Sequence, residues 1–381
     1  MRKILLLGAS GSIGSQSLDL LKADGKSFRL TAFSLGKRVE KVDEILTDFP
    51  SVERVCVQLE EDAERLAKKY PDILFYHGDE GLRQICLEAD YDMAINALVG
   101  FSGLIPSLTV LSQDKILCLA NKESLVVGGD LIKKALNGGK GKLYPIDSEH
   151  VALAKLINKA GIEHVERMII TASGGSFRDR KREELTDVTP EEALAHPTWK
   201  MGAKITIDCA TMMNKGFEVI EAMHLFDFPA EKIDVLIHEE SNIHSMLLLD
   251  DGSYLADISK PDMHGPIEWA IYEGKVDYQL YKAKDYHDFG PFHFRQFDPE
   301  RYPAVGLCLE AYKKGGNMPA VLNAANEEAV YAFLAKKIPF LDIERLVSFA
   351  LREAAFVTNP SLRDILRADG FARMFIRRIA G

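Results

Sequence analysis

The 381-residue sequence has no long hydrophobic run, no paired-cysteine motif and no excess of positive charge. No stretch approaches the roughly 18 apolar residues of a transmembrane helix, and the apolar run at residues 4–7 is too short for a signal peptide. Lys and Arg number 47 against 57 Asp and Glu, a net charge of −10. That balance argues against broad binding to nucleic acid or anionic membranes. We expect a cytoplasmic protein with no nucleic-acid or membrane partner, whereas small anionic ligands are not excluded.

The five cysteines are scattered and form no Cys-x-x-Cys pair. A disulfide framework or a thiolate zinc site is therefore not expected, and a reducing cytosol is the natural compartment. Hydrophobic residues make up 47% and charged residues 27%, as in ordinary soluble globular proteins. A chain of this length is typical of two or three domains, and it needs no disulfide or structural metal in order to fold.

Short apolar runs alternate with helical patterns over the first 147 residues. The strand-like runs lie at residues 4–7, 29–34, 55–57, 73–75, 92–97 and 115–120, and helical spacing appears at 39–48 and 62–70. Strand and helix at this rhythm predict an α/β domain with a Rossmann-like, doubly wound parallel sheet.

The pattern changes near residue 148, where an α+β domain is expected. Residues 167–171, 204–207, 235–238 and 244–249 look like strands, and 250–253 like a hairpin turn leading to 254–258. Residues 261–303 read as a connection with little local structure, and apolar residues recur at helical spacing from 304 onward. We therefore predict domains at 1–147 and 148–272, a linker at 273–299 and a C-terminal helical bundle at 300–381.

A glycine-rich turn, Gly8-Ala9-Ser10-Gly11-Ser12-Ile13-Gly14, lies between the first expected strand and the first expected helix. Glycines here permit a tight turn and let the backbone approach a pyrophosphate at the helix N-terminus. The position favours dinucleotide binding, and a purely structural turn is the alternative.

The end of the second expected strand bears on the choice of nucleotide. NAD enzymes place an acidic residue there for the ribose 2′-hydroxyl, whereas basic residues accommodate the 2′-phosphate of NADP. This chain has Gly36-Lys37-Arg38, which favours NADP. The alternative is an ordinary solvated basic turn.

Two carboxylates, Asp147 and Glu149, follow the first domain. In an extended segment their side chains would point the same way, and paired carboxylates suit a hard cation such as Mg²⁺ or Mn²⁺. An Asp-x-Glu pair is also common at solvated edges, so a metal site needs a third ligand. Glu218 can supply it.

Residues 212–218 are expected to be helical, with Asn214, Lys215 and Glu218 on one face. Lysine and asparagine beside a carboxylate would place phosphate-binding donors next to a metal ligand, and a surface ion pair is the alternative. Much of the apolar face would be formed by Met213, Phe217, Ile220 and Met223.

Three loops complete the set of motifs. The small-residue loop at 171–176 could cradle a phosphate or be a plain loop. Residues 178–184 are expected to be a solvated face of mixed charge. Residues 196–202, with a histidine, a tryptophan and a methionine, could close over a ligand or anchor a core loop.

Taken together, these motifs resemble the 1-deoxy-D-xylulose 5-phosphate reductoisomerase family over essentially the whole chain. The resemblance is carried by the strings at residues 8–14, 121–126, 145–150, 173–175, 196–202, 210–216, 261–263 and 322–327. It implies an NADPH- and metal-dependent enzyme, with Mg²⁺ or Mn²⁺, that acts on a sugar phosphate, and it implies a homodimer. The expected reaction is a retro-aldol and aldol rearrangement followed by hydride reduction, giving 2-C-methyl-D-erythritol 4-phosphate for isoprenoid synthesis.

The resemblance also assigns residues. Metal ligands would be Asp147, Glu149 and Glu218, and the catalytic residues Lys122, Glu149, His196 and Glu218. Substrate would contact Lys122, Ser148, Glu149, Ser173, His196, Trp199, Met201, Cys209, Asn214, Lys215 and Glu218, with Trp199 and Met201 in a flap. NADPH would contact Gly8, Ser10, Gly11, Ser12, Ile13, Gly36, Lys37, Arg38, Asn121, Glu123, Gly202 and, near the nicotinamide, Met263.

The chain departs from the usual family pattern at several positions. Cys209 stands where the family has a serine that donates to the substrate phosphate, and a thiol is a weaker donor. Ser10 replaces a threonine, and Arg38 replaces an asparagine, which should strengthen the 2′-phosphate contact. Two other readings remain: a semialdehyde dehydrogenase with Cys209 as nucleophile, and a noncatalytic NADPH-binding regulator.

Overall fold

The computed structural model describes residues 1–275 and 290–381. Contacts within the chain divide it into two compact units. The first contains Met1–Ser124, Asp130–Val151 and a stretch that begins at Asp262. The second contains Leu125–Gly129, Ala152–Pro261 and the C-terminal part of the chain to Gly381. Each unit has a sheet of its own.

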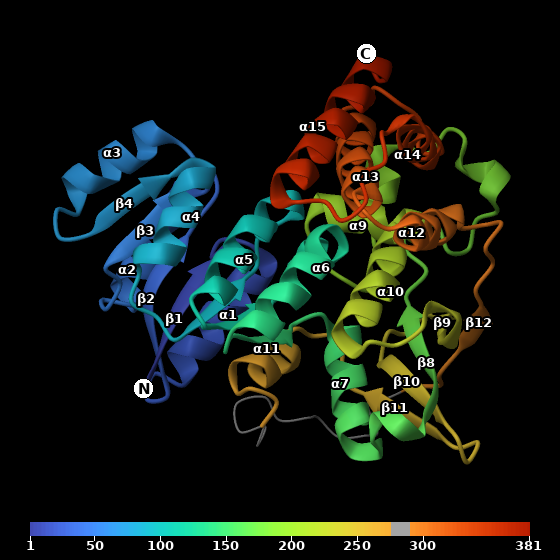
Figure 1. The fold of residues 1–381 in the computed structure, drawn as a ribbon, viewed down its shortest axis with the longest axis horizontal. Coiled ribbons are helices and arrows are strands. Elements are labelled where there is room, and N and C mark those ends of the chain that lie inside the picture. The colour runs from blue at the N-terminus through green and yellow to red at the C-terminus, as the bar shows by residue number, and fades with distance from the viewer. Residues whose placement is uncertain (276–289) are drawn as a thin grey trace. The chain divides into compact units, whose positions relative to one another are not determined.

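The first unit is built on a seven-stranded parallel sheet (Figure 1). Its strands are β1 (Arg2–Leu7), β2 (Phe28–Ser34), β3 (Arg54–Val57), β4 (Leu74–His77), β5 (Met93–Asn96), β6 (Ile116–Leu119) and β7 (Lys142–Pro145). Their order is β4-β3-β2-β1-β5-β6-β7. The continuous apolar run of β1 is buried because strands and helices cover it on all sides. The predicted doubly wound sheet is confirmed.

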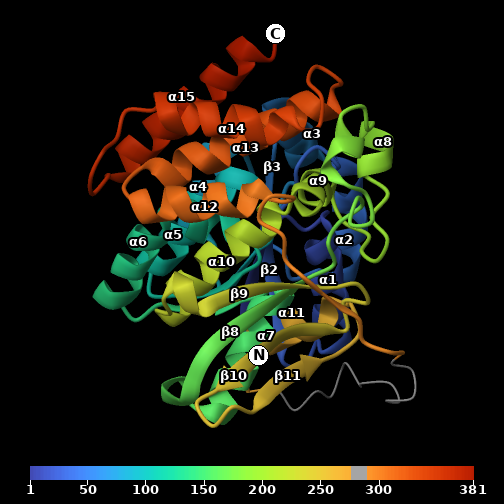
Figure 2. The same ribbon diagram turned by 90° about the vertical axis from the view of Figure 1, so that its right-hand side faces the viewer.

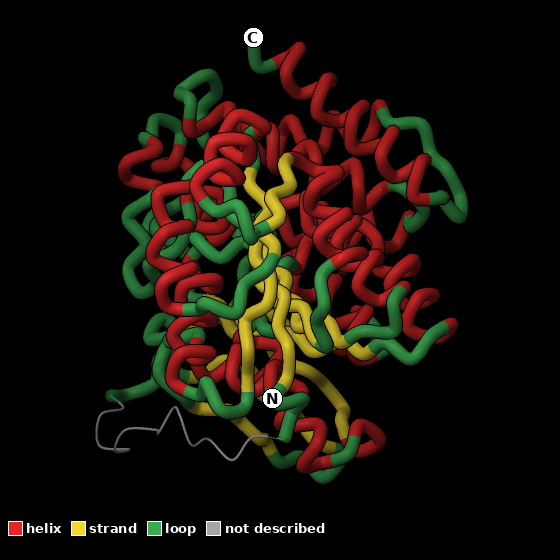
Figure 3. The backbone as a smooth tube through the Cα atoms, turned by 90° about the vertical axis from the view of Figure 1, so that its left-hand side faces the viewer, coloured by secondary structure: helices red, strands yellow, loops and turns green. Residues whose placement is uncertain are grey.

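Helices flank this sheet, as the tube in Figure 3 shows. They are α1 (Ser12–Ala23), the 3₁₀ turn η1 (Val39–Lys41), α2 (Val42–Asp48), α3 (Glu60–Lys69), α4 (Gly78–Glu88), the 3₁₀ turn η2 (Gly100–Gly103), α5 (Leu104–Ser112) and α11 (His264–Ile271). Helix α1 buries Leu20 and Leu21 and packs beside α11. The chain runs between the units within α6 (Lys122–Gly138), which is kinked at Gly128, and within α7 (Ser148–Ala160).

The second unit contains a five-stranded mixed sheet. Its strands are β8 (Val165–Ala172), β9 (Ile233–His238), β10 (Ile243–Leu249), β11 (Tyr254–Ile258) and β12 (Phe294–Gln296), in the order β11-β10-β8-β9-β12. The pair β8 and β9 is parallel, so both strands end at one edge, while the other pairs are antiparallel. The predicted hairpin turn joins β10 to β11, with Gly252 at φ +83°.

Helices fill the rest of the second unit (Figure 2). They are η3 (Ile162–His164), η4 (Arg182–Leu185), α8 (Pro190–Ala193), α9 (Ala203–Thr211), α10 (Met213–Phe226), η5 (Ala230–Lys232), α12 (Pro303–Lys314), α13 (Met318–Leu334), α14 (Asp342–Glu353) and α15 (Leu362–Ile379). Helices α9 and α10 lie between the sheet and the C-terminal helices, with α10 packed against β8 and α12. The predicted helical C-terminal region is confirmed.

One predicted strand is wrong. Residues 204–207 belong to helix α9, although Ile205, Thr206 and Ile207 favour a strand by their β-branched side chains. Tertiary contacts outweigh that preference: Lys204 pairs with Asp208 one turn later at 2.7 Å, and Asn326 of α13 donates to the same carboxylate at 2.8 Å. All three polar side chains are buried, so the helical spacing of the ion pair determines the local structure.

The predicted connection at 261–303 holds more structure than expected, since α11 and β12 both lie in it. Residues 276–289 of the predicted linker lie outside the described residues. In the part of the chain that the structure describes, no helix has the length and apolar character needed to cross a bilayer. The five cysteines, all of which lie within the described residues, form no disulfide with one another.

Candidate active site

The glycine-rich turn of the first unit is held by close backbone packing. Gly8 directly follows β1 and has φ +85°, and a Cβ there would lie 2.6 Å from the carbonyl oxygen of Ala97. A Cβ on Gly14, in the first turns of α1, would lie 2.2 Å from the Gly8 oxygen. Only glycine fits both positions, because the neighbouring atoms are backbone. The turn thus brings the N-terminus of α1 against the end of β1, the geometry that suits a bound pyrophosphate.

The end of β2 lies beside this turn. Ser34 Oγ accepts a hydrogen bond from the Gly8 amide at 3.0 Å, and the Arg38 guanidinium donates to the Ser10 carbonyl. The backbone at Gly36 is open, since a Cβ there would have no atom within 4 Å, and Lys37 is exposed. The two predicted nucleotide motifs, 8–14 and 36–38, are therefore neighbours in the first unit.

Asn121 caps the start of α6. Its Oδ1 accepts from the Ser124 amide at 3.0 Å, while its Nδ2 donates to the carbonyls of Leu98 and Gly100 at 2.9 Å each. The amide group also contacts Glu123 at 3.2 Å. The side chain is buried, so it fixes the loop after β5 to the first turn of α6, with Lys122 at the helix start.

Lys122 pairs with Asp147 in the first unit. The structure corrects the expected extended segment: α7 begins at Ser148, so Asp147 precedes the helix and Glu149 lies in its first turn. Asp147 accepts from the Glu149 amide at 3.2 Å, and His150 Nδ1 lies 3.2 Å from the same carboxylate. Burial would raise the pKa of Asp147, but the charge of Lys122 and the His150 contact outweigh it and hold that pKa well below its usual range. Asp147 is therefore an anion.

Helix α10 of the second unit presents three buried polar side chains. Asn214 donates from Nδ2 to Glu218, and the Lys215 ammonium pairs with the other oxygen of the same carboxylate. Their exposures are 8%, 3% and 1% for Asn214, Lys215 and Glu218, which rules out the surface ion pair. Burying charged side chains costs desolvation free energy. Because buried charges often occur at functional sites, Lys215 and Glu218 are candidates for a functional role. The apolar face predicted for this helix (Met213, Phe217, Ile220 and Met223) is buried as expected.

The loop after β8 carries Ser173 and reaches the end of α9. Gly175 has φ +72°, and a Cβ on it would lie 2.4 Å from the carbonyl oxygen of Cys209. Ser173 Oγ accepts from the Gly175 amide at 3.3 Å and lies 3.0 Å from His196 Nε2. The second unit therefore gathers Ser173, His196 and the backbone of Cys209, which is half-buried.

The expected flap residues follow α8 as a loop. His196 Nδ1 accepts from the amides of Thr198 and Trp199 at 3.1 and 2.9 Å. Burial, helped by the charge of Arg178, lowers the pKa of His196 to about 4. The imidazole is therefore neutral near pH 7. Met201 remains in the loop, and Gly202 caps α9.

His244 on β10 and Ser241 in the preceding turn are buried polar residues to which the sequence reasoning assigned no role. The His244 ring lies 6.3 Å from that of Trp199, and burial lowers its pKa to about 4. Ser241 has φ +55°, and its buried hydroxyl has no hydrogen-bond partner among residues 1–275 and 290–381. A histidine inside a strand pattern gives only a weak signal, whereas the polar run before β10 could have directed attention to this turn.

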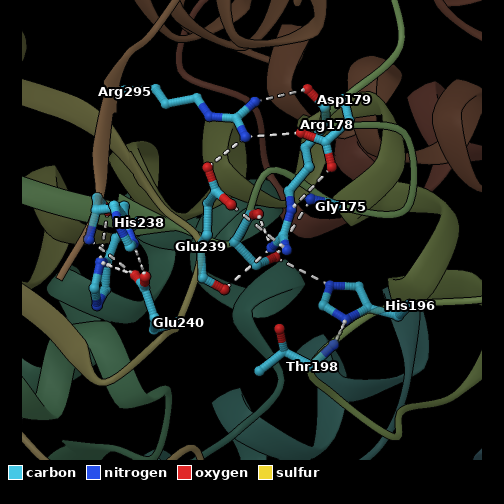
Figure 4. A network of polar contacts seen from close by, with 11 residues as sticks. Gly175, Arg178, Asp179, His196, Thr198, His238, Glu239, Glu240 and Arg295 are labelled. Carbon is cyan, nitrogen blue, oxygen red and sulfur yellow. Dashed lines mark hydrogen bonds and ion pairs between the residues drawn. The ribbon is translucent and has the colours of Figure 1, made fainter. Parts of the chain in front are cut away.

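The expected solvated face at 178–184 is also wrong in part. The Arg178 side chain is only 17% exposed, and it donates to the carbonyls of Ser173 and Glu239 at 3.2 and 3.0 Å (Figure 4). Arg178 and Arg180 lie in the same run of mixed charge in the sequence, but Arg180 does pair at the surface with Glu192. Only the tertiary fold distinguishes the two arginines.

Several of the remaining predicted residues lie at the N-terminal ends of helices. Gly11 caps α1, followed by Ser12 and Ile13 in its first turn. Ser148 donates to Glu149 at 2.6 Å, and Met263 caps α11. A doubly wound sheet with a glycine turn, in one chain with an α+β unit that buries charged side chains, defines a two-unit protein of the Rossmann-like α/β class.

Comparisons with known proteins identify the family. The family model of 1-deoxy-D-xylulose 5-phosphate reductoisomerase matches residues 4–129, and the models of its C-terminal domains match 143–226 and 258–375. The reductoisomerase of Geobacillus kaustophilus (strain HTA426) is 46% identical over 383 residues, covering 100% of both chains. Reductoisomerase 2 of Bacillus thuringiensis subsp. konkukian (strain 97-27) is 45% identical over 377 residues, covering 99% of both chains.

Solved structures agree with this relationship. The Zymomonas mobilis enzyme in complex with NADPH has a TM-score of 0.91 at 37% identity and covers 100% of this chain and 99% of that chain. A reductoisomerase in complex with NADPH, fosmidomycin and magnesium has a TM-score of 0.92 at 33% identity and covers 100% and 98%. The chain belongs to the 1-deoxy-D-xylulose 5-phosphate reductoisomerase family.

Proposed function

We propose that the chain is an NADPH- and divalent-metal-dependent reductoisomerase. It converts 1-deoxy-D-xylulose 5-phosphate to 2-C-methyl-D-erythritol 4-phosphate in non-mevalonate isoprenoid synthesis. The observation that carries the proposal is the buried Asn214-Lys215-Glu218 face of α10, in a chain that matches the family along its whole length. The alternative interpretation, a surface ion pair between Lys215 and Glu218, would leave these side chains exposed to solvent.

NADPH is assigned mainly to residues of the first unit, with Gly202 as a contact from the second. Gly8, Ser10, Gly11, Ser12 and Ile13 lie at the N-terminus of α1, where amide groups and the helix dipole favour a pyrophosphate. Additional NADPH contacts are assigned to Gly36, Lys37, Arg38, Asn121, Glu123, Gly202 and Met263. The two cations at 37 and 38 suit the 2′-phosphate. Arg38 reaches the backbone of Ser10, which supports this role.

The divalent cation, Mg²⁺ or Mn²⁺, is assigned to Asp147, Glu149 and Glu218. Carboxylate oxygens are the ligands that such hard cations prefer. The donor chemistry fits, because Asp147 is held ionised by Lys122 and His150. When bound, the cation polarises the substrate ketone and NADPH supplies the hydride.

The substrate phosphate is assigned to Ser173, Cys209, Asn214 and Lys215. Ser173 lies in a loop packed against the Cys209 backbone, and Lys215 brings positive charge to the start of α10. Phosphate binding away from the reacting carbons orients them and contributes remote binding energy. Neutral His196 brings no charge to the substrate, and its Nε2 lies 3.0 Å from Ser173 Oγ. Trp199 and Met201 exclude water as flap residues.

Lys122 and Ser148 complete the substrate contacts. Lys122 pairs with Asp147, so its ammonium lies beside an anionic carboxylate. From that position it serves proton transfer or stabilises an oxyanion. Glu149, in the first turn of α7, accepts a hydrogen bond from Ser148 at 2.6 Å.

The organisation of the enzyme extends the proposal. We assign NADPH binding to residues 1–147 and catalysis to 148–272, followed by a linker at 273–299 and a helical domain at 300–381. A homodimer and a cytoplasmic location are further parts of the proposal. Tyr254 of the edge strand β11 is 62% exposed, which supports a dimer because exposed edge strands can pair between chains.

The proposal is tested by NADPH oxidation with 1-deoxy-D-xylulose 5-phosphate. We expect turnover that is lost on chelation and restored by Mg²⁺ or Mn²⁺. A semialdehyde dehydrogenase acting through Cys209 would instead be insensitive to chelation and inactivated by thiol alkylation. NADPH binding without any turnover would indicate a regulator. Either result would contradict the proposal.

A further inference from the structure

Arg178 ties together the ends of two neighbouring strands. Strands β8 and β9 are parallel and in register through Ala172 and Ile237, so their chains emerge at one edge of the sheet. Just beyond these strands, the carbonyls of Ser173 and Glu239 each accept a hydrogen bond from the same Arg178 nitrogen, at 3.2 and 3.0 Å (Figure 4).

The loop that Arg178 holds has few side chains of its own. Gly174 and Gly175 follow Ser173 with φ of +82° and +72°. Glycine loses more backbone freedom on folding than any other residue, so this loop is costly to order. A Cβ on Gly174 would lie 2.7 Å from the Arg178 Cβ, so the arginine packs directly on the loop. Fixing this backbone therefore depends on a partner outside the glycines.

A second layer holds Arg178 in turn. The Glu239 carboxylate lies 3.8 Å from the Arg178 guanidinium and pairs with Arg295 of β12, which also bonds Asp179 at 2.7 Å (Figure 4). Arg295 faces Ile237 across the β9–β12 ladder. Arg178 is 17% exposed and Arg295 is 43% exposed, so Arg178 is the inner member of the network.

The same network determines how the Ser173 hydroxyl is used. His196 Nδ1 accepts two backbone amides, those of Thr198 and Trp199, so the proton of the neutral ring is on Nε2. That N–H then donates to Ser173 Oγ at 3.0 Å, and the Gly175 amide donates to it at 3.3 Å. With two bonds accepted, the hydroxyl retains its one hydrogen to donate.

We propose that Arg178 is a positioning residue that fixes the Ser173-Gly174-Gly175 loop and the Ser173–His196 pair, so that the Ser173 hydroxyl donates its hydrogen to the phosphate of the substrate. The inference rests on the proposed function and deepens it. Arg178 itself does not touch the substrate. It acts through the Ser173 carbonyl and through its charge, which favours the neutral form of His196.

Two variants separate the two roles of Arg178. Arg178→Met removes both the charge and the hydrogen bonds, whereas Arg178→Lys keeps the charge but cannot reproduce the planar donor group. The matched control is Arg180→Met, because Arg180 lies two residues away and pairs at the surface with Glu192 at 2.9 Å. Each full-length variant is assayed for KM and kcat, and the His196 ring is titrated by NMR.

For Arg178→Met we expect the KM for 1-deoxy-D-xylulose 5-phosphate to rise about tenfold, with kcat and the KM for NADPH changed less than about threefold. The pKa of His196 should rise from its value of about 4. Arg178→Lys should raise the substrate KM while keeping the low His196 pKa. Arg180→Met should match the wild type in every measurement.

Equal substrate KM and equal His196 pKa in Arg178→Met and Arg180→Met would overturn the proposal. A lower kcat with a rise of similar size in both KM values, together with a lower Tm, would also overturn the proposal. Such a result would indicate that the variant is generally destabilised. If Arg178→Met does not fold, Arg178→Lys decides: a substrate KM like that of the wild type overturns the proposal.

Failure of the proposed function can be recognised separately. If the wild type shows no turnover, inorganic phosphate is titrated while the amide signals of Gly174 and Gly175 are followed by NMR. Weaker phosphate binding in Arg178→Lys than in Arg180→Met then supports the positioning role without any activity. Equal binding in the two variants overturns it.

Discussion

The glycine loops at residues 8–14 and 173–175 are held in different ways. The turn at residues 8–14 is shaped by its own backbone, since Gly14 packs against the Gly8 carbonyl. The loop at 173–175 is held from outside by Arg178, which donates to the Ser173 carbonyl. Both loops follow a strand and contain glycines with positive φ. The first encodes its geometry locally, whereas the second depends on residues that the fold brings to it.

The two loops also differ in the charges around them. Beside the first, Lys37 is exposed and Arg38 reaches the backbone of Ser10, which suits a ligand that carries a phosphate at the protein surface. Near the second, the charged side chains of α10 are buried, with Lys215 paired to Glu218. Burying charged groups costs desolvation free energy, so removing the charge of Glu218, which balances Lys215, should have the largest effect on the reaction.

The largest effect is expected from Glu218→Gln. The amide keeps the shape of the side chain but loses the negative charge that binds a cation and balances Lys215. We expect kcat to fall about a thousandfold, while NADPH still binds in a fluorescence titration. Glu166→Gln is the control, because Glu166 is exposed and lies 3.4 Å from Lys232. Comparable activity of the two variants would contradict the assignment of Glu218.

Gly14→Ala tests the first loop. The new Cβ would lie 2.2 Å from the Gly8 oxygen, which is backbone and cannot turn aside. The turn must therefore shift, and we expect the KM for NADPH to rise about a hundredfold, with little change in phosphate binding by the second unit. Gly25→Ala, where the nearest atom would be 3.9 Å away, should behave like the wild type. Unchanged NADPH binding in Gly14→Ala would refute this role of the turn.

The same difference explains how far the sequence alone could be interpreted. Spacing of Gly8, Gly11 and Gly14 after an apolar run was sufficient for the first loop, because its constraints are local. Likewise the i, i+3 and i, i+4 relations of Lys215, Asn214 and Glu218 held in α10. The parallel sheet was predictable because most of its strands are short apolar runs.

Predictions that depended on tertiary partners were less successful. Residues 204–207 have strand-like side chains, yet Asp208 and Asn326 stabilise a helix there. Asp147 and Glu149 were placed in an extended segment, whereas α7 begins between them. Arg178 was assigned to a solvated face because nothing in its neighbours along the chain reveals the carbonyls of Ser173 and Glu239.

The second unit should also respond to acid through its buried histidines. Burial lowers the pKa of His244 to about 4 from the ordinary 6.5. Between these values the unfolded chain binds a proton that the folded chain does not, so stability falls as pH drops from 6.5 to about 4 and His244 adds no slope above 6.5. The loss amounts to at most about 3 kcal/mol, since one pKa unit is worth about 1.4 kcal/mol.

Urea unfolding at about pH 7, 5.5 and 4.5, spanning that window, measures this loss for the wild type and for His244→Asn. Carboxylates contribute to both proteins, so the difference between the two slopes isolates the histidine. We expect a shallower decline in the variant. Parallel declines would show that His244 is not held neutral by its surroundings.

The smallest effect is expected from Cys209→Ser. A hydroxyl is a stronger and shorter donor than a thiol, and residue 209 lies at the end of α9 against the Ser173 loop. We expect the KM for the sugar phosphate to fall about threefold, with the KM for NADPH unchanged. An unchanged or higher substrate KM would count against phosphate binding at this position.

The control for this exchange is made at the surface. Cys308→Ser is unsuitable, because Cys308 is buried against Met213. Ser253→Cys makes the reverse exchange at an exposed position of the β10–β11 turn, and it should leave both KM values unchanged. A shift of the substrate KM in Ser253→Cys would show that a thiol or hydroxyl far from the Ser173 loop alters the assay.

We propose that one active site both rearranges a carbon skeleton and reduces it. The most direct measurement is ¹³C NMR of the product formed from ¹³C-labelled 1-deoxy-D-xylulose 5-phosphate with NADPH and Mg²⁺. We predict the branched skeleton of 2-C-methyl-D-erythritol 4-phosphate, with one NADPH oxidised for each product formed. A linear polyol phosphate, reduced without rearrangement, or no labelled product at all, would contradict the claim.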